Sequence, residues 1–432
     1  MSEIYEPDGA PATGAFADGR GENPNSADAR RVAFGRLLRP LVLRALDNWH
    51  VGRLTIHLPE GTTVVAGRAD AKPQATVRIV SDRFFGDFAL KGDLGAGESY
   101  MDGAWSADNL PRLLELVLLN QGAVGGDSWL SGLLNLPNDV RHRLRRNTRR
   151  GSRRNIGAHY DLSNELFALF LDPSMTYSSA VFASPDEPLE SAQKRKFERL
   201  ADRLELQPGQ HVLEIGCGWG AFAMHLARRY DVRVTGITVS REQLELATQR
   251  VKEAGLDRQI DIRLCDYRDV TGRYDAIVSV EMLEAVGREH WPTFFERCHA
   301  VLAPGGQVGI QTITMPDHRF EQYAAHCDWI QKYIFPGGLL PSIGQMIQAM
   351  GAHTPFVMRH LEDIGPHYAE TLARWRSAFF ANLAEVRRLG FDQRFVRMWD
   401  FYLASCEASF RTRVLGNHQF VLARAGGSDS AG

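Results

Sequence analysis

The stretch that decides the fold is His211-Val-Leu-Glu-Ile-Gly-Cys-Gly-Trp-Gly220, an apolar run that ends in an acid and continues into three glycines at alternate positions. Two further apolar runs follow it, and they lead into Thr238-Val-Ser-Arg-Glu-Gln243 and Cys265-Asp-Tyr267. Glycine lets a backbone approach a ligand closely, and the start of the next helix offers free N–H groups to an anion. Alternating strands and helices with such a first turn predict a doubly wound α/β sheet that receives a nucleotide-like ligand.

The polar residues after these runs favour S-adenosylmethionine over a dinucleotide as the cofactor. We expect the Asp266 carboxylate to accept the adenine amino protons and the Tyr267 ring to stack on the base. Many methyltransferases place an acid where this chain has Thr238, so Gln243 is expected to contact the ribose hydroxyls. An ordinary strand–turn–helix junction remains the alternative for the glycine stretch alone. The predicted cofactor residues of the three turns are Glu214, Gly216, Gly218, Trp219, Gly220, Thr238, Gln243, Asp266 and Tyr267.

Six short apolar segments are the predicted strands of this sheet, because strands covered on both faces are apolar throughout. They are His211–Ile215, Arg233–Thr238, Ile260–Leu264, Tyr274–Val280, Gln307–Thr312 and His418–Ala423. Helices are predicted between them at Gly220–Tyr230, Ser240–Ala254 and Trp291–Val301. Residues 315–405 interrupt the alternation with aromatic-rich sequence, which predicts a helical insertion that forms a lid or a substrate pocket.

The chain divides into four predicted sections. They are a disordered tail at 1–30, a small mixed α+β domain at 31–140, a basic linker at 141–157 and the large domain at 158–427. The tail is rich in Gly, Ala, Asp and Asn. Alternating runs at Arg53–His57 and Ala75–Val80, followed by helical apolar spacing at Leu110–Leu119, support the small domain.

Composition excludes several classes of protein. The formal net charge of −2 gives no global field toward nucleic acid. The five cysteines show no paired or metal-type spacing, and His299, His318 and His326 lack ligand-like partners, so we expect reduced thiols and no metal. No run approaches the roughly 18 apolar residues of a membrane span, and the first 30 residues do not resemble a signal peptide. We therefore expect a cytoplasmic protein.

A basic run at Arg141–Asn155 holds eight arginines and no acid. It fits a solvated linker or an RNA-binding segment, although it lacks interleaved aromatic residues for base stacking. Anionic headgroups contribute about 1 kcal/mol per basic residue at a membrane surface, and the adjacent Trp129–Leu136 is apolar enough to enter the interface. We expect Arg141–Arg154 to hold the protein on the inner face of the cell membrane.

Seven strings resemble the cyclopropane-fatty-acid synthases and the related mycolic-acid cyclopropane synthases. They are His159–Phe167, Leu171–Ser178, Glu214–Gly220, Asp266–Asp269, Val278–Glu284, Lys332–Gly338 and His367–Leu372. The resemblance spans roughly residues 155–425 and is loose over 31–140. It implies a methyltransferase that acts on the cis double bond of an acyl chain in a membrane phospholipid, with Tyr177 and Ser178 closing over the cofactor. It also implies a homodimer and a lipid-binding role for the small domain.

Within this family, three segments most resemble the branch that adds a methylene carbon to C10 of oleoyl chains on the way to tuberculostearic acid. The segments are Val280–Val286, Gln311–Pro316 and Trp329–Pro341. This resemblance implies a 10-methylene-stearoyl product. It leaves open whether a reductase partner then saturates that product.

The resemblance also locates a pocket in which family members bind bicarbonate. Its Glu and Tyr correspond to Glu284 and Tyr368, whereas its Cys and His are replaced by Ser179 and Gln311, a nearby Gly by Glu281 and a further His by Ala285. Two like charges ~4 Å apart repel by roughly 4 kcal/mol at an effective dielectric constant of about 20, so an added carboxylate disfavours an anion. We therefore expect no bicarbonate, and we expect Glu281 or Glu284 to take the proton from a carbocation.

Structural alternatives exist for each of these side chains. Glu281 would cap the helix that follows, Ser179 would keep only a backbone contact, and Glu284 would be one of a pair of acids at a helix start. Tyr368 would be a core tyrosine. The aromatic segments Trp375–Phe380 and Phe395–Tyr402 either pack in the core or line an acyl tunnel.

Other functions also remain open at this point. In one alternative the protein closes a cyclopropane ring, as other family members do, or acts on a free or carrier-bound fatty acid. In another alternative the protein is an inactive lipid-binding homologue, although the complete set of cofactor residues argues against a loss of catalytic activity. A methyltransferase of small molecules or nucleic acid is a further alternative, but the basic run lies outside the cofactor domain.

Overall fold

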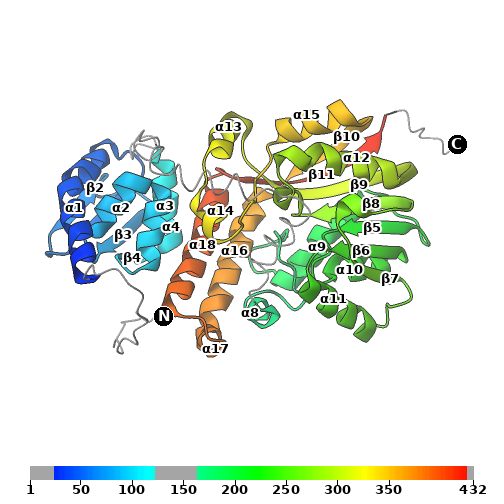
Figure 1. Ribbon diagram of the computed structural model, residues 1–432, viewed down its shortest axis with the longest axis horizontal. Coiled ribbons are helices and arrows are strands. Elements are labelled where there is room, and N and C mark those ends of the chain that lie inside the picture. The colour runs from blue at the N-terminus through cyan, green and yellow to red at the C-terminus, as the bar shows by residue number, and fades with distance from the viewer. Residues whose placement is uncertain (1–23, 122–162, 426–432) are drawn as a thin grey trace.

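The computed structural model describes residues 24–121 and 163–425 and shows a small and a large domain packed end to end (Figure 1). Helix α1 (Pro24–Arg44) begins inside the predicted tail, so the disorder expected for residues 24–30 is wrong. Three features predicted from the sequence lie outside the described residues. They are the rest of that tail, the apolar segment Trp129–Leu136 and the basic run Arg141–Asn155.

The large domain contains a seven-stranded sheet in the order β10-β11-β9-β8-β5-β6-β7. Its strands are β5 (His211–Ile215), β6 (Arg233–Thr238), β7 (Ile260–Leu264), β8 (Tyr274–Val280), β9 (Leu302–Thr314), β10 (Phe356–Asp363) and β11 (Gly416–Arg424). Strands β5 to β9 are parallel, whereas β11 runs antiparallel to both β9 and β10. The bounds predicted for β5 to β8 are confirmed, and β9 and β11 are longer than predicted.

Strand β10 corrects the prediction of a helical insertion at 315–405. After the buried Phe356, its residues alternate between exposed and partly buried positions, as expected for an edge strand. It pairs with β11 through a register shift between Met358 and His360. The rest of the insertion is helical as predicted. Its helices are α13 (Asp317–Ala325), α14 (Trp329–Tyr333), α15 (Ile343–His353), α16 (Gly365–Ala381), α17 (Leu383–Arg388) and α18 (Gln393–Arg411).

Helices cover both faces of the large sheet, which explains why the central strands β5, β6 and β8 are almost entirely buried. One buried cluster joins the sheet to α9 (Leu189–Asp202), α10 (Ala221–Tyr230) and α11 (Arg241–Glu253), and another joins it to α12 (Trp291–Val301) and α15. The short helix α8 (Asn164–Ala168) precedes them. The helices predicted at 220–230, 240–254 and 291–301 are therefore confirmed as α10, α11 and α12.

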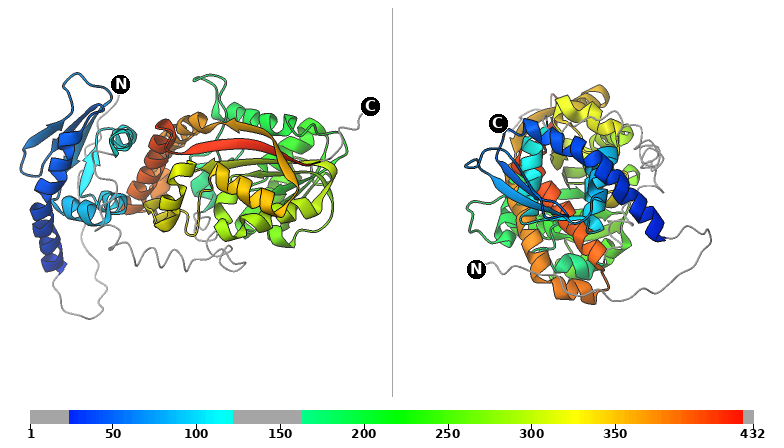
Figure 2. Two further views of the ribbon diagram at one scale, coloured as in Figure 1. Left: turned by 90° about the horizontal axis from the view of Figure 1, so that it is seen from above. Right: turned by 90° about the vertical axis from the view of Figure 1, so that its left-hand side faces the viewer.

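The small domain is a four-stranded sheet, in the order β2-β1-β3-β4, packed with helices. Its strands are β1 (Arg53–His57), β2 (Thr63–Ala66), β3 (Gln74–Ile79) and β4 (Trp105–Ala107), and its further helices are α2 (Arg83–Lys91), α3 (Asp93–Met101) and α4 (Leu110–Leu119). The mixed α+β architecture expected for this region is confirmed. Figure 2 shows α1 on the outer side of this domain, facing away from the large sheet.

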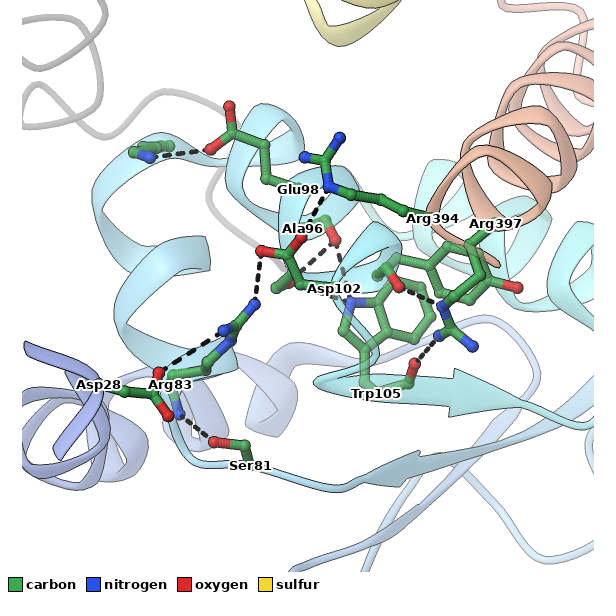
Figure 3. A network of polar contacts seen from close by, with 12 residues as sticks. Asp28, Ser81, Arg83, Ala96, Glu98, Asp102, Trp105, Arg394 and Arg397 are labelled. Atoms are coloured by element: carbon green, nitrogen blue, oxygen red, sulfur yellow. Dashed lines mark hydrogen bonds and ion pairs between the residues drawn. The ribbon is translucent and has the colours of Figure 1, made fainter. Parts of the chain in front are cut away.

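The small domain contacts α14 and α18 of the insertion through both polar and apolar side chains. Figure 3 shows the polar contacts that Arg394 and Arg397 of α18 make with Asp102 and the backbone of Trp105. The Tyr100 hydroxyl donates to the Asp400 carboxylate at 2.6 Å, and the Arg397 guanidinium donates to the backbone carbonyl groups of Tyr100 and Trp105. Gly97 lies so close to Trp329 and Phe401 that a Cβ atom there would be 2.4 Å from the Trp329 ring. A single buried cluster crosses this boundary, so the two domains share part of their core.

We predict that Tyr100→Phe destabilises this junction. The substitution removes a buried hydrogen bond to a carboxylate, which is worth about 1.5–3 kcal/mol of the free energy of unfolding. Tyr230→Phe is a matched control, because Tyr230 makes the same 2.6 Å bond to Asp202 in an exposed setting. Urea unfolding of both variants measures the difference, and equal losses would contradict the structural role assigned to Tyr100.

Candidate active site

A cavity of about 620 Å³ opens at the carboxyl ends of β5, β6 and β8. Its walls include the glycine-rich turn, residues of α14, α16 and α18, and Asp93, Leu118 and Gln121 of the small domain. Most of the side chains predicted from the sequence meet there. They are Tyr177, Ser178, Glu214, Gly216, Gly218, Trp219, Thr238, Gln243, Asp266, Tyr267, Glu281, Glu284 and Tyr368, with Ser179, Gly220 and Gln311 placed behind this lining.

The glycine-rich turn has the backbone geometry that the sequence predicts. Gly216, Gly218 and Gly220 all have positive φ angles, of 82°, 52° and 81°, and L-residues with side chains rarely adopt this region. A Cβ atom at Gly216 would also lie 2.8 Å from the Met282 side chain. The turn thereby brings the start of α10 against the cavity.

Glu214 supplies a buried acceptor beside this turn. Its Oε2 atom has no hydrogen-bond partner among the residues that the structure describes, and burial raises the pKa of its carboxyl group to about 8. A buried acceptor without a partner is unfavourable unless a ligand satisfies it. The ammonium group of S-adenosylmethionine is a donor of the required kind, so the residues present fit this cofactor.

The second turn presents an amide to the cavity. The Thr238 hydroxyl donates to Gln243 Oε1 at 2.7 Å, and Ser240 accepts the Gln243 backbone N–H as the N-cap of α11. Because the Oε1 atom is engaged by Thr238, the Nε2 group is the donor that this amide can offer to a ligand. The expectation that Gln243 replaces the usual acid is therefore consistent with the geometry.

The third turn differs in one respect from the sequence expectation. Arg268 binds both oxygens of Asp266, at 2.8 Å to Oδ1 and 2.6 Å to Oδ2, so the carboxylate would have to share its lone pairs with an adenine amino group. Tyr267 lies at the cavity wall with its ring edge-to-face against Phe294, at 5.6 Å between centroids. The Arg268 ion pair was not foreseen.

Glu281 lies at the centre of the reactive end of the cavity. Its backbone is left-handed, with φ of 49°, and its carboxylate accepts hydrogen bonds from four separate segments of the chain. The donors to Oε1 are the Ser179 backbone N–H at 3.0 Å, Gln311 Nε2 at 2.8 Å and Asn417 Nδ2 at 2.6 Å, and the donor to Oε2 is the Tyr368 hydroxyl at 2.8 Å. These contacts contradict the alternative in which Glu281 caps a helix.

The groups around Glu281 are themselves held in place. Gln419 donates to Gln311 Oε1 at 2.9 Å, which fixes the orientation of the Gln311 amide toward Glu281. The Tyr368 ring stacks on Phe410 at 4.6 Å. The Ser179 hydroxyl donates to the Ala180 carbonyl at 3.0 Å, so Ser179 contacts the carboxylate through its backbone alone.

Glu284 is a second buried acid in the same cavity. It accepts from the Ile313 backbone N–H at 2.5 Å, while its Oε2 atom has no partner within residues 24–121 and 163–425. Burial, together with the charge of Glu281, raises its pKa to about 8. Glu284 is therefore mostly protonated at neutral pH, and it sits on a single 3-10 turn (Leu283–Ala285) rather than as a paired acid at the start of an α-helix.

The remaining expectations have mixed outcomes. Tyr177 lies at the cavity, and its hydroxyl contacts the Tyr402 hydroxyl at 2.7 Å. Trp375 and Trp399 belong to the core, whereas Tyr402 lines the cavity, and the lining of an acyl tunnel by these aromatic segments stays a prediction. In the described part of the chain no group of His, Cys, Asp and Glu could hold a metal, and no helix is long and apolar enough to cross a membrane.

Sequence reasoning missed two residues that contact the site. Asn417 is the second residue of β11 and reaches Glu281 because the sheet places β11 beside β9, which local sequence does not reveal. Lys196 is fully buried on α9, although it lies in the charged string Lys194-Arg195-Lys196. A signal was present, since Ala192, Lys196 and Leu200 recur every four residues on one helix face and all are buried.

The sheet order, the glycine turn and the unpaired Glu214 acceptor together define a class I S-adenosylmethionine-dependent methyltransferase. A sequence model of the family described as "Mycolic acid cyclopropane synthetase" matches residues 147–420. The chain therefore belongs to this family.

Individual relatives agree with this assignment. The chain is 43% identical over 395 residues to "Tuberculostearic acid methyltransferase UfaA1" of Mycobacterium tuberculosis, covering 88% of this chain and 92% of the relative. It is 39% identical over 388 residues to the cyclopropane-fatty-acyl-phospholipid synthase of Escherichia coli, covering 88% and 94%. The solved structure of mycolic acid cyclopropane synthase CmaA1 complexed with SAH and CTAB matches with a TM-score of 0.58 and 34% identity, covering 62% of this chain and 97% of that chain.

Proposed function

We propose that this enzyme methylates the cis double bond of an unsaturated fatty acyl chain in a membrane phospholipid. The product is a methylene-branched acyl chain, such as 10-methylene-stearoyl from oleoyl. The observation that carries the proposal is the Glu281 carboxylate, held by four donors in the cavity beside the cofactor turn. The similarity to the tuberculostearic acid methyltransferase of Mycobacterium tuberculosis supports the same branch. The residues proposed to hold the cofactor are Tyr177, Ser178, Glu214, Trp219, Thr238, Gln243, Asp266 and Tyr267 together with the three glycines of the first turn.

The reaction demands a group that removes one proton without adding water. When bound, S-adenosylmethionine supplies an electrophilic methyl group. The π electrons of the alkene form the new C–C bond at C10, a hydride moves from C10 to C9, and the positive charge comes to rest on C10. Glu281 then takes a proton from the new methyl group, and the electron pair of that C–H bond becomes the exocyclic double bond.

The surroundings of Glu281 suit this role. A fixed negative charge stabilises the developing cation, and the aromatic faces of Tyr177, Tyr402 and Phe410 line the same cavity. Protonated Glu284 adds no second negative charge close to the base. A bound bicarbonate would need hydrogen-bond donors from the protein. The four donors at this position are already engaged by the Glu281 carboxylate.

Ring closure is the second candidate, because the chain also resembles the Escherichia coli cyclopropane-fatty-acyl-phospholipid synthase. In that case the proton would still leave the new methyl group, but its electron pair would close onto the cationic carbon before any hydride shift. A free or carrier-bound fatty acid remains the alternative substrate. The homodimer and the reductase partner stay predictions from the family resemblance.

We predict a methylene-branched product from the wild-type enzyme. Purified protein is incubated with dioleoyl phospholipid vesicles and methyl-labelled cofactor, and the released acyl chains are analysed by mass spectrometry and double-bond cleavage. The expected chain carries one added carbon and retains one unsaturation as an exocyclic methylene. A cyclopropyl chain as the product would contradict the proposal. If free oleic acid is labelled and the phospholipid is not, the substrate is a free fatty acid instead.

Two substitutions at Glu281 test its role. Glu281→Gln removes the base while retaining the size of the side chain, so turnover should fall by about 10²–10⁴-fold with little change in binding of S-adenosylhomocysteine. Glu281→Gly suits the left-handed backbone and frees four donors, so added bicarbonate should restore turnover and shift the product toward the ring. Turnover by Glu281→Gln at the wild-type rate would exclude Glu281 as the base.

We further propose that the enzyme works on the membrane surface and that α1 contributes to docking. Phe34, Leu37 and Leu41 lie on one face of α1 and are 41%, 73% and 65% exposed. The same face carries Arg30 and Arg44 at its two ends, and residues 29–46 contain no acid. A basic helix with an exposed apolar face suits an anionic lipid surface. Pairing with α1 of a second copy is less suitable, since antiparallel helices would oppose Arg30 and Arg44.

We predict that Leu37→Ser combined with Leu41→Ser weakens binding to vesicles containing phosphatidylglycerol by about tenfold or more. Leu389→Ser is the control, because Leu389 is an exposed leucine (41%) on the large domain, outside α1. Co-sedimentation measures binding, and turnover on detergent-dispersed substrate should be retained. If the double variant changes the oligomeric state while vesicle binding persists, a second copy of the chain covers this face instead.

A further inference from the structure

Lys196 is a buried cation that the proposed chemistry does not use. Its side chain is completely inaccessible to solvent, and its Nζ atom donates to the Ser178 hydroxyl at 2.6 Å. The same atom lies 4.4 Å above the centre of the Phe197 ring. Because Ser178 and Phe197 both line the cavity, Lys196 lies directly behind the cofactor end of the site.

The charge of Lys196 is only indirectly compensated. Among the described residues no carboxylate lies within ion-pair distance of Nζ, and the charges of Glu281, Asp172 and Glu214 act on it from farther away. Burial outweighs their attraction and lowers the pKa of Lys196 to about 8. Burying a charge without an ion pair is unfavourable, and an apolar side chain of similar length would pack there at lower free energy. The buried position of Lys196 therefore indicates that its positive charge interacts with a ligand in the cavity.

Ser178 connects Lys196 to that ligand. Its backbone carbonyl accepts from Gln193 at 2.9 Å, and its hydroxyl oxygen accepts from Lys196, so the residue is fixed from the protein interior. The hydroxyl hydrogen is left to donate into the cavity. Glu214 presents an unpaired acceptor to the same cavity, so the site offers an acceptor for an ammonium group and a donor for a carboxylate.

We propose that Lys196 is a positioning residue that anchors the α-carboxylate of S-adenosylmethionine through the Ser178 hydroxyl. Lys196 orients and polarises the hydroxyl, and its positive charge attracts the carboxylate through a medium of low dielectric constant. The inference depends on the cofactor alone and is independent of the acyl substrate.

Binding of two ligands separates this role from a packing role. S-adenosylhomocysteine carries the amino-acid group, whereas 5′-methylthioadenosine retains the nucleoside and thioether but lacks that group. Lys196→Met retains the length of the side chain and should weaken binding of S-adenosylhomocysteine by tenfold or more, while binding of methylthioadenosine stays within about twofold of wild type. Lys194→Met is the matched control, since Lys194 lies two residues away on the same helix with its side chain 57% exposed.

Titration calorimetry of both ligands supplies the decisive outcomes. Ser178→Ala should reproduce the selective loss, and the double variant should bind no more weakly than the worse single variant, because the two residues act as one relay. Equal losses for both ligands would assign Lys196 to packing, and an unchanged affinity for S-adenosylhomocysteine in Lys196→Met would overturn the proposal. Ser178→Ala keeps the test valid if Lys196→Met fails to fold.

The pH dependence gives a second readout. The charged form of Lys196 is the form that attracts the carboxylate, so wild-type affinity for S-adenosylhomocysteine should fall as pH rises above about 8. Lys196→Met should lose the part of this dependence that is due to Lys196, and the difference between the two pH profiles isolates it from the titration of the ligand's own amine. Identical profiles for the two proteins would contradict the proposal.

Discussion

The active site depends on one buried carboxylate whose hydrogen bonds come from four distant parts of the chain. Glu281 follows β8, and its donors lie on the segment before α9, on β9, on β11 and on α16. A carboxylate in an apolar cavity is unfavourable unless donors replace the lost water, so these elements have to meet at one point. The position of β11 between β9 and β10 makes this meeting possible, because it places Asn417 opposite Ile313.

The other charged groups of the cavity divide between its two ends. Glu281 and Glu284 occupy the reactive end, where the neighbouring charge helps to keep Glu284 protonated. Glu214 and Lys196 occupy the cofactor end, where each has a group that the protein alone leaves partly unsatisfied. The ammonium and carboxylate groups of the cofactor's amino-acid part suit the unpaired Glu214 acceptor and the Lys196 cation at that end. The arrangement therefore separates groups that bind the cofactor from groups that meet the cation formed on the lipid.

Much of the large domain was predictable because its strands and helices have strong local signals. The apolar runs of β5 to β8 gave correct bounds, and the glycine turn identified the cofactor end. Strand β10 escaped detection because it is a half-exposed edge strand between helices. Asn417 escaped for a different reason, since only the sheet topology brings it into contact with Glu281, 136 positions earlier in the chain. The family resemblance supplied Glu281, Ser179, Gln311 and Tyr368 as candidates, whereas the hydrogen bonds that join them and the fourth donor, Asn417, required the structure.

The junction between the domains explains how a small N-terminal domain can influence chemistry at the sheet. Helix α18 contacts the small domain through Asp400 and Arg397, and over its following turns Tyr402, Ser405 and Ser409 line the cavity. The cavity also reaches Asp93, Leu118 and Gln121 of the small domain. A displacement of the small domain would therefore move one wall of the cavity, and through the stacking of Phe410 of α18 on Tyr368 it would also reach a donor of Glu281.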